Sequence, residues 1–191
     1  MKKVVLDIET KNTFQQVGKN EPRLLDISLL VVYDYSTDQY STFLENELNK
    51  LWPILENTDL IIGYNSDYFD IPILNKYYPG DLTKIKSLDL LEEIRKSLGH
   101  KIRLDSVANG TLGISKGGNG LDAITWYKNG EIEKIKKYCQ QDVKITKEIY
   151  EFALNNKFLR YKILDETKQF PIDTATWEEK KETTINLTMP W

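Results

Sequence analysis

The N-terminal run Val4–Thr10 constrains the fold of this 191-residue chain more than any other stretch. It is apolar and rich in β-branched residues, which is typical of a buried strand. Asp7 and Glu9 interrupt it, and because they are two residues apart, a strand points both side chains to one face. Neighbouring like charges repel each other and lose hydration. Either a divalent cation such as Mg²⁺ compensates them, or the strand end reaches solvent.

Composition fits one compact, intracellular α/β domain. Hydrophobic residues make up 40% of the chain and charged residues 29%. The single cysteine, Cys139, excludes an internal disulfide and a cysteine-rich zinc site, and the single histidine, His100, leaves little scope for histidine catalysis. No apolar run reaches the length of a membrane span, and no signal pattern precedes Val4. We therefore expect a cytoplasmic protein with no membrane partner.

The formal net charge of −3 argues against tight binding of duplex DNA, because such binding depends on bulk positive charge. It leaves room for an enzyme that grips a few nucleotides locally.

Hydrophobic periodicity predicts a mixed sheet of about five strands flanked by helices. Besides the first strand, strands are expected at 27–35, 39–44, 59–63 and 85–88. Helices are expected at 45–56 with a kink or break at Pro53, and at 69–78, 89–98, 104–112, 121–127 and 131–155. Residues 11–23 are expected to form a loop, and 158–164 and 170–173 a hairpin around 165–168. We expect one domain over 1–175 and a loosely held polar tail over 176–191.

A second motif, Gly63 to Asp70, follows a short predicted strand and opens a helix. In α/β sheets, ligands bind beyond the carboxyl ends of strands, which favours a site role for Asn65 and Asp70. The alternative is structural: Asn65 and Ser66 cap the helix, and Asp70 interacts with its N-terminus.

A third motif lies in the longest predicted helix. Tyr138 and Asp142 are four residues apart, so they share a face of that helix. Asp142 falls beside an apolar stripe, where a carboxylate requires a partner. That partner is either a nearby lysine, such as Lys137 or Lys144, or a metal ion.

Together these motifs place Asp7, Glu9, Asp70, Tyr138 and Asp142 on a strand, a helix start and a late helix. In this order the chain resembles the DEDD superfamily of 3′–5′ exonucleases, in its tyrosine-bearing subclass (DEDDy). The middle motif, Tyr-Asn-x-x-x-Phe-Asp, resembles the proofreading domain of B-family DNA polymerases and its stand-alone relatives. In the histidine subclass, a histidine stands five residues before the last aspartate, where this chain has Lys137. The resemblance covers roughly residues 2–154 and implies a ribonuclease H-like fold.

The resemblance also implies the chemistry of the site. Asp7, Glu9, Asp70 and Asp142 would hold two divalent cations, Mg²⁺ or Mn²⁺, which activate water and stabilise the leaving 3′-oxygen. Tyr138 would orient the attacking water, since an unperturbed tyrosine, with a pKa of about 10, is a poor general base.

The expected substrate is the 3′ end of single-stranded DNA or RNA, with DNA favoured, and the product is a nucleoside 5′-monophosphate. Thr10 and Asn65 are expected to contact the terminal nucleotide. Lys116 is either a phosphate contact or a solvated loop lysine.

Several alternatives remain open from the sequence. The chain is interpreted either as a DNA exonuclease that acts alone or through a recruiting protein, or as an enzyme that trims RNA 3′ ends. An endonuclease and a non-catalytic nucleic-acid-binding module of the same fold are further alternatives. A basic run at and after the end of the predicted helix at 89–98 either tracks a strand of nucleic acid or complements the helix C-terminus; its residues are Lys96, His100, Lys101 and Arg103. Residues 113–120 do not match a phosphate-binding loop, because Asn119-Gly120 stands where Lys-Ser/Thr is required.

Overall fold

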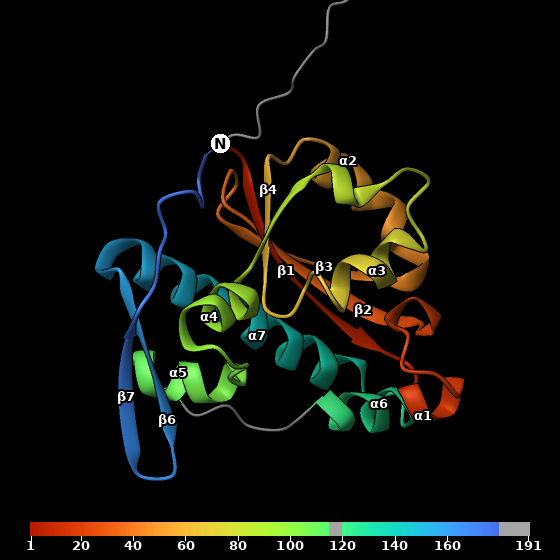
Figure 1. Cartoon of the computed structure of the whole chain (residues 1–191). Coiled ribbons are helices and arrows are strands. Elements are labelled where there is room, and N and C mark those ends of the chain that lie inside the picture. The colour runs from red at the N-terminus through yellow and green to blue at the C-terminus, as the bar shows by residue number, and fades with distance from the viewer. Residues whose placement is uncertain (115–119, 180–191) are drawn as a thin grey trace, which may run out of the picture.

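A five-stranded mixed sheet forms the centre of the molecule, as expected. The computed structural model describes residues 1–114 and 120–179. The strand order is β3-β2-β1-β4-β5. The strands are β1 (Lys3–Thr10), β2 (Ile27–Asp34), β3 (Gln39–Leu44), β4 (Leu60–Gly63) and β5 (Lys86–Asp89). The central strand, β1, runs antiparallel to β2 and parallel to β4 (Figure 1).

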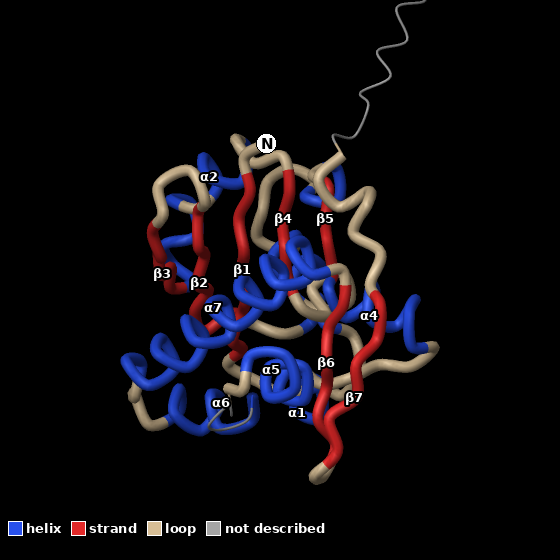
Figure 2. The backbone as a smooth tube through the Cα atoms, turned by 90° about the vertical axis from the view of Figure 1, so that its left-hand side faces the viewer, coloured by secondary structure: helices blue, strands red, loops and turns tan. Residues whose placement is uncertain are grey.

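Helices cover both faces of this sheet. One face packs against the 3₁₀ helix η2 (Glu45–Lys50), α2 (Trp52–Glu56) and α3 (Asp70–Asn75). The other packs against α4 (Leu90–Leu98), α5 (Leu104–Leu112), α6 (Gly120–Lys128) and the long α7 (Ile132–Asn156). In Figure 2, α7 crosses in front of the sheet, and the separate hairpin of β6 (Phe158–Ile163) and β7 (Glu166–Pro171) lies beside it. Within the described ranges, no helix combines the length and the apolar content that a bilayer span requires.

Side chains alternate between the two faces of the sheet along β1, and this alternation determines on which face its acidic residues lie. Val4, Leu6 and Ile8 join the core under α2 and α3. Val5 joins the core under α7, and because side chains alternate along a strand, Asp7 and Glu9 share its face. The thiol of Cys139 on α7 donates a hydrogen bond to the carbonyl oxygen of Asp7 at 3.2 Å. The acidic end of β1 therefore lies directly under α7.

The structure corrects several predicted boundaries. The loop at 11–23 contains two short helices, α1 (Phe14–Val17) and η1 (Pro22–Leu24). The break expected near Pro53 in the predicted helix at 45–56 is confirmed, and it lies at Leu51, between η2 and α2. Pro53 therefore falls in the first turn of α2, where a missing N–H costs little. The predicted helix at 69–78 is shorter, since α3 ends at Asn75.

The C-terminal hairpin turns earlier than expected. Ile163 pairs with Glu166, so the turn is Leu164-Asp165 and the residues 166–168 belong to β7. Leu164 adopts a φ of 53°, the left-handed region that a hairpin turn requires. A leucine carries no turn signal, which explains the error.

The prediction of a loosely held tail from 176 onward is wrong for its first residues. Trp177 is 1% exposed and stacks on Tyr150, with ring centroids 5.8 Å apart. Its indole N–H donates to Glu93 at 3.0 Å, and Glu178 forms an ion pair with Lys3 at 2.5 Å. This segment therefore packs against α4, α7 and β1. The remainder of the predicted tail, 180–191, lies outside the described residues.

Candidate active site

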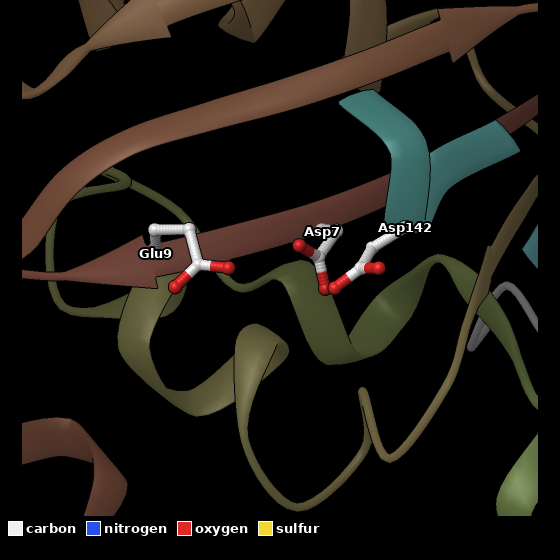
Figure 3. Close-up of side chains that lie close together, drawn as sticks. All are labelled: Asp7, Glu9 and Asp142. Carbon is white, nitrogen blue, oxygen red and sulfur yellow. The ribbon is translucent and has the colours of Figure 1, made fainter. Parts of the chain in front are cut away.

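Three predicted metal ligands converge between β1 and α7. Asp7 and Glu9 project from the same side of β1, and the carboxylate of Asp142 faces that of Asp7 (Figure 3). One carboxylate oxygen from each residue lies within 4.8 Å of the other two. Glu9 and Asp142 are 8% and 5% exposed. The spacing of two residues on a strand thus has the predicted geometric consequence.

Asp70 lies beside this cluster rather than within it. It is the first residue of α3, and its carboxylate accepts a hydrogen bond from the backbone N–H of Ile8 at 2.9 Å. On the β4 side, the backbone of β1 is paired only from Lys3 to Val5. The N–H of Ile8 lies beyond this pairing, and Asp70 supplies its hydrogen-bond acceptor. This bond ties Asp70 to the backbone between Asp7 and Glu9.

The electrostatic environment of Asp70 is unfavourable for its charged form. Its side chain is 3% exposed, and burial, followed by the nearby charge of Asp7, raises its pKa well above the ordinary value. A cation at the cluster would reverse this effect, because opposite charge favours the carboxylate form.

A single cavity of about 670 Å³ unites the predicted residues. Its size is in the range of ligand sites. The cavity is lined by every predicted site residue that the structure describes, namely Asp7, Glu9, Thr10, Asn65, Asp70, Tyr138 and Asp142. Lys116, the remaining predicted substrate contact, lies outside the described residues.

Tyr138 reaches the cavity from α7, one turn before Asp142. Its ring meets the edge of Trp126 from α6, with centroids 5.7 Å apart and planes at 70°. Such edge-to-face packing restricts the orientation of the ring. Trp126 therefore positions Tyr138, a contact that depends on how α6 packs against α7 and has no signal in the sequence.

The two predicted substrate contacts that are described differ in their surroundings. The hydroxyl of Thr10, which is 6% exposed, donates to the carbonyl oxygen of Asn12 at 3.0 Å. Asn65 has a φ of 65°, a left-handed conformation that asparagine tolerates better than most residues. Both line the cavity, with Thr10 at the end of β1 and Asn65 in the loop after β4.

Asp89 is a structural residue of the site that the sequence analysis missed. Its carboxylate accepts backbone N–H bonds from Asn65 at 2.7 Å, Asp67 at 3.1 Å and Leu91 at 2.9 Å. Burial raises its pKa, while these bonds oppose the rise. An aspartate between a strand and a helix is an N-cap signal, which accounts for the bond to Leu91. The bonds to the loop arise only because β5 lies beside β4.

Gly63 brings this same loop close to the end of β4. A Cβ atom at Gly63 would lie 2.4 Å from the Cβ of Ser66, a distance that real structures do not tolerate. Gly63 and Asp89 together therefore shape the loop that carries Asn65 and leads into Asp70.

Comparison with known proteins assigns the chain to a family. The sequence profile of the RNase H superfamily matches residues 4–154. The chain belongs to the RNase H superfamily. No curated protein sequence shows significant similarity to it.

Two solved structures resemble this RNase H superfamily chain. The family B DNA polymerase from the hyperthermophilic archaeon Pyrobaculum calidifontis matches with a TM-score of 0.62 and 17% identity over 81% of this chain. Trypanosoma brucei RNase D matches with a TM-score of 0.60 and 15% identity, also over 81%. The matched regions span 24% of the polymerase and 58% of RNase D. At these identities, the likeness establishes the RNase H-like fold.

The donor set of this superfamily member suits a hard divalent cation. Three carboxylates offer oxygen atoms within 4.8 Å of one another, and carboxylate oxygens are the ligands that Mg²⁺ and Mn²⁺ prefer. Asp70 adds a fourth carboxylate to the same cavity. The partly buried Asp7 and the buried Glu9, Asp70 and Asp142 therefore fit a metal centre.

Proposed function

We propose that this protein is a metal-dependent 3′–5′ exonuclease that hydrolyses single-stranded nucleic acid, DNA in preference to RNA, to nucleoside 5′-monophosphates. The observation that carries the proposal is the convergence of Asp7, Glu9, Asp70, Asp142 and Tyr138 in one cavity. These five residues match the DEDDy pattern in type and order. A nucleic-acid binder without catalysis would gain nothing from clustered negative charge.

We assign a role to each of these side chains within the proposal. Two divalent cations bound by the carboxylates would neutralise the charge that develops on the phosphate and activate the attacking water. The hydroxyl of Tyr138 holds that water in line with the phosphorus atom. Water adds to phosphorus, the bond to the 3′-oxygen breaks, and the departing oxygen takes up a proton. Thr10 and Asn65 position the terminal nucleotide at the carboxyl end of β1 and β4.

Removal of nucleotides from RNA 3′ ends is the second candidate. Trypanosoma brucei RNase D matches the fold nearly as well as the family B polymerase does. The two substrates differ at the 2′-hydroxyl. The likeness of the middle motif to polymerase proofreading domains favours DNA.

Purified protein incubated with 5′-labelled single strands of DNA and RNA tests the proposal. With Mg²⁺ or Mn²⁺, we expect a ladder that shortens from the 3′ end, and chelator abolishes it. Asp7→Ala removes the activity, whereas Asp165→Ala at the exposed hairpin turn leaves it intact. Cleavage that persists in Asp7→Ala would contradict the proposal.

A circular single strand provides the remaining control. An exonuclease leaves it uncut, and cleavage would assign an endonuclease instead. Binding of strands without any metal-dependent turnover would assign a non-catalytic module.

A further inference from the structure

The active-site cavity combines four carboxylates with one cationic side chain among the described residues that line it. That side chain is Arg103. A phosphodiester strand is repelled by carboxylates, and the net charge of −3 provides no general attraction. A strand that enters the cavity therefore requires local positive charge at its mouth.

The backbone around Arg103 is fixed to the active-site loop. The preceding residue, Ile102, is 7% exposed, and its carbonyl oxygen accepts a hydrogen bond from the hydroxyl of Tyr64 at 2.7 Å. Tyr64 directly precedes Asn65 in the loop between β4 and α3. The hydrogen bond between Tyr64 and Ile102 thus fixes the position of the Arg103 backbone relative to the loop between β4 and α3.

The side chain of Arg103 is available to a ligand. It is 80% exposed, and its contact with Asp105 is long, at 3.6 Å. An exposed pair at this distance contributes little to stability. Arg103 is also the N-cap residue of α5, where the helix dipole disfavours a cation. Local structure therefore does not account for an arginine at this position.

A second cation, Lys101, lies two residues before Arg103 in the sequence and close to an aromatic ring. Lys101 lies 3.4 Å from Glu92 and 5.8 Å from the ring centroid of Tyr68. Tyr68 is 44% exposed and belongs to the same loop as Asn65. Cations interspersed with an exposed aromatic ring are typical of surfaces that bind single strands by phosphate contacts and base stacking.

We propose that Arg103 binds the backbone phosphate on the 5′ side of the scissile bond. Lys101 and Tyr68 then bind the part of the strand that extends further in the 5′ direction, and the three residues together form the proposed track. The inference rests on the proposed function, which places the 3′ nucleotide at the carboxylates and the rest of the strand at the mouth. The planar guanidinium donates two parallel hydrogen bonds to a phosphate, which a lysine cannot match.

Two substrates separate strand binding from chemistry. The p-nitrophenyl ester of thymidine 5′-monophosphate has only the reacting phosphate, whereas an oligothymidylate of about eight nucleotides also occupies the proposed track. For Arg103→Gln, we expect kcat/KM on the oligothymidylate to fall about tenfold, mainly through KM. Hydrolysis of the ester stays at the wild-type rate. Arg103→Lys recovers part of the loss.

Arg23→Gln is the matched control, because Arg23 is 71% exposed and does not line the cavity. Equal losses in Arg23→Gln and Arg103→Gln would overturn the proposal in favour of a bulk charge effect. Equal losses on both substrates in Arg103→Gln would also overturn it, since they would indicate a defect in the chemistry.

Binding provides a readout that survives a failure of the proposed function. The affinity of the same oligothymidylate, measured with chelator over a series of salt concentrations, gives a log–log slope. One lost phosphate contact makes the slope shallower by about 0.7. If wild type hydrolyses neither substrate, the exonuclease proposal fails, yet a shallower slope in Arg103→Gln still supports the phosphate contact. An unchanged slope overturns it.

Discussion

The carboxylates of Asp7 on β1 and Asp142 on α7 face each other and repel (Figure 3). This repulsion leads to the first prediction. In chelator, Asp7→Asn should melt at a higher temperature than wild type, because it removes repulsion among buried carboxylates. Mg²⁺ should stabilise wild type, by about 2.7 kcal/mol when the free ion exceeds its Kd a hundredfold, and should stabilise the variant far less. Thermal melts of both proteins with and without the ion measure this. Equal stabilisation of the two proteins by Mg²⁺ would contradict the metal assignment.

Tyr138 allows the hydroxyl to be tested apart from the ring. Tyr138→Phe keeps the edge-to-face contact with Trp126, so the melting temperature should stay within a few degrees of wild type. The rate of 3′ nucleotide release should fall about a hundredfold, since the attacking water loses its orienting partner. Single-turnover kinetics measure this rate. Stabilisation by Mg²⁺ is the internal control, and its loss would mean that the substitution had disturbed the carboxylates instead.

Individual residues of the site were predictable where a single element decides their geometry. The period of a strand places Asp7 with Glu9, and the period of a helix places Tyr138 with Asp142. Asp89 and Trp126 escaped because their roles depend on neighbouring elements, namely β5 beside β4 and α6 beside α7. Periodicity within one segment carries no information about such contacts.

At the scale of elements, the contact between α5 and β6 depends on a glycine. A Cβ atom at Gly110 would lie 2.6 Å from the backbone of Tyr161. Beside it, the hydroxyl of Thr111 donates to the carbonyl oxygen of Arg160 and accepts from its N–H. Gly110 therefore sets how closely α5 and the hairpin approach.

Gly110→Ala should lower the free energy of unfolding by about 1–3 kcal/mol, because α5 must move away from β6. The higher helix propensity of alanine, worth about 1 kcal/mol, offsets part of this loss. Urea denaturation measures the difference. Gly120→Ala is the control, since a Cβ atom there meets no atom of the described residues within 4 Å and the backbone needs no positive φ. A neutral result for Gly110→Ala would show that the hairpin shifts at no cost.

Elements were predictable in type and order, and less so at their ends. The strands of the main sheet and the long helix were expected close to their observed bounds, since burial imposes a clear period on them. Pro53 predicted the break between η2 and α2, whereas the early turn at Leu164 depends on local backbone geometry. The leucine at the hairpin turn does not differ, in sequence, from a leucine of the core.

At the scale of the whole molecule, the segment after β7 ties the end of the described chain to α4, α7, β5 and β1. Its polar composition predicted a loose tail, yet one aromatic residue, Trp177, holds it against Tyr150 and α4. Lys86 at the start of β5 donates to the carbonyl oxygens of Thr176 at 2.6 Å and Glu179 at 2.7 Å. One buried indole and a few specific polar contacts thus hold a segment of polar composition, which composition averaged over a window does not reveal.

Glu178 makes the attachment of the segment after β7 sensitive to pH. Hydrogen bonds from Lys3 and then from Tyr150 lower the pKa of the Glu178 carboxyl, although partial burial opposes them. A lowered carboxyl pKa contributes stability above the unfolded-state pKa, about 4.3 for glutamate, and that contribution is lost as the pH falls through the folded-state value. Attachment of the segment should therefore weaken in acid.

Glu178→Gln removes the same negative charge that acid removes in wild type. The segment should therefore detach from the variant at neutral pH as often as it detaches from wild type in acid. We expect faster proteolysis after β7 in the variant at pH 7, and a difference from wild type that shrinks as the pH falls below about 4. Hydrogen exchange of the segment measures the same equilibrium without a protease. Glu166→Gln on the hairpin is the control, because the side chain of Glu166 is 75% exposed. A difference that persists undiminished in acid would mean that packing of Trp177, and not the charge of Glu178, holds the segment to the body of the protein.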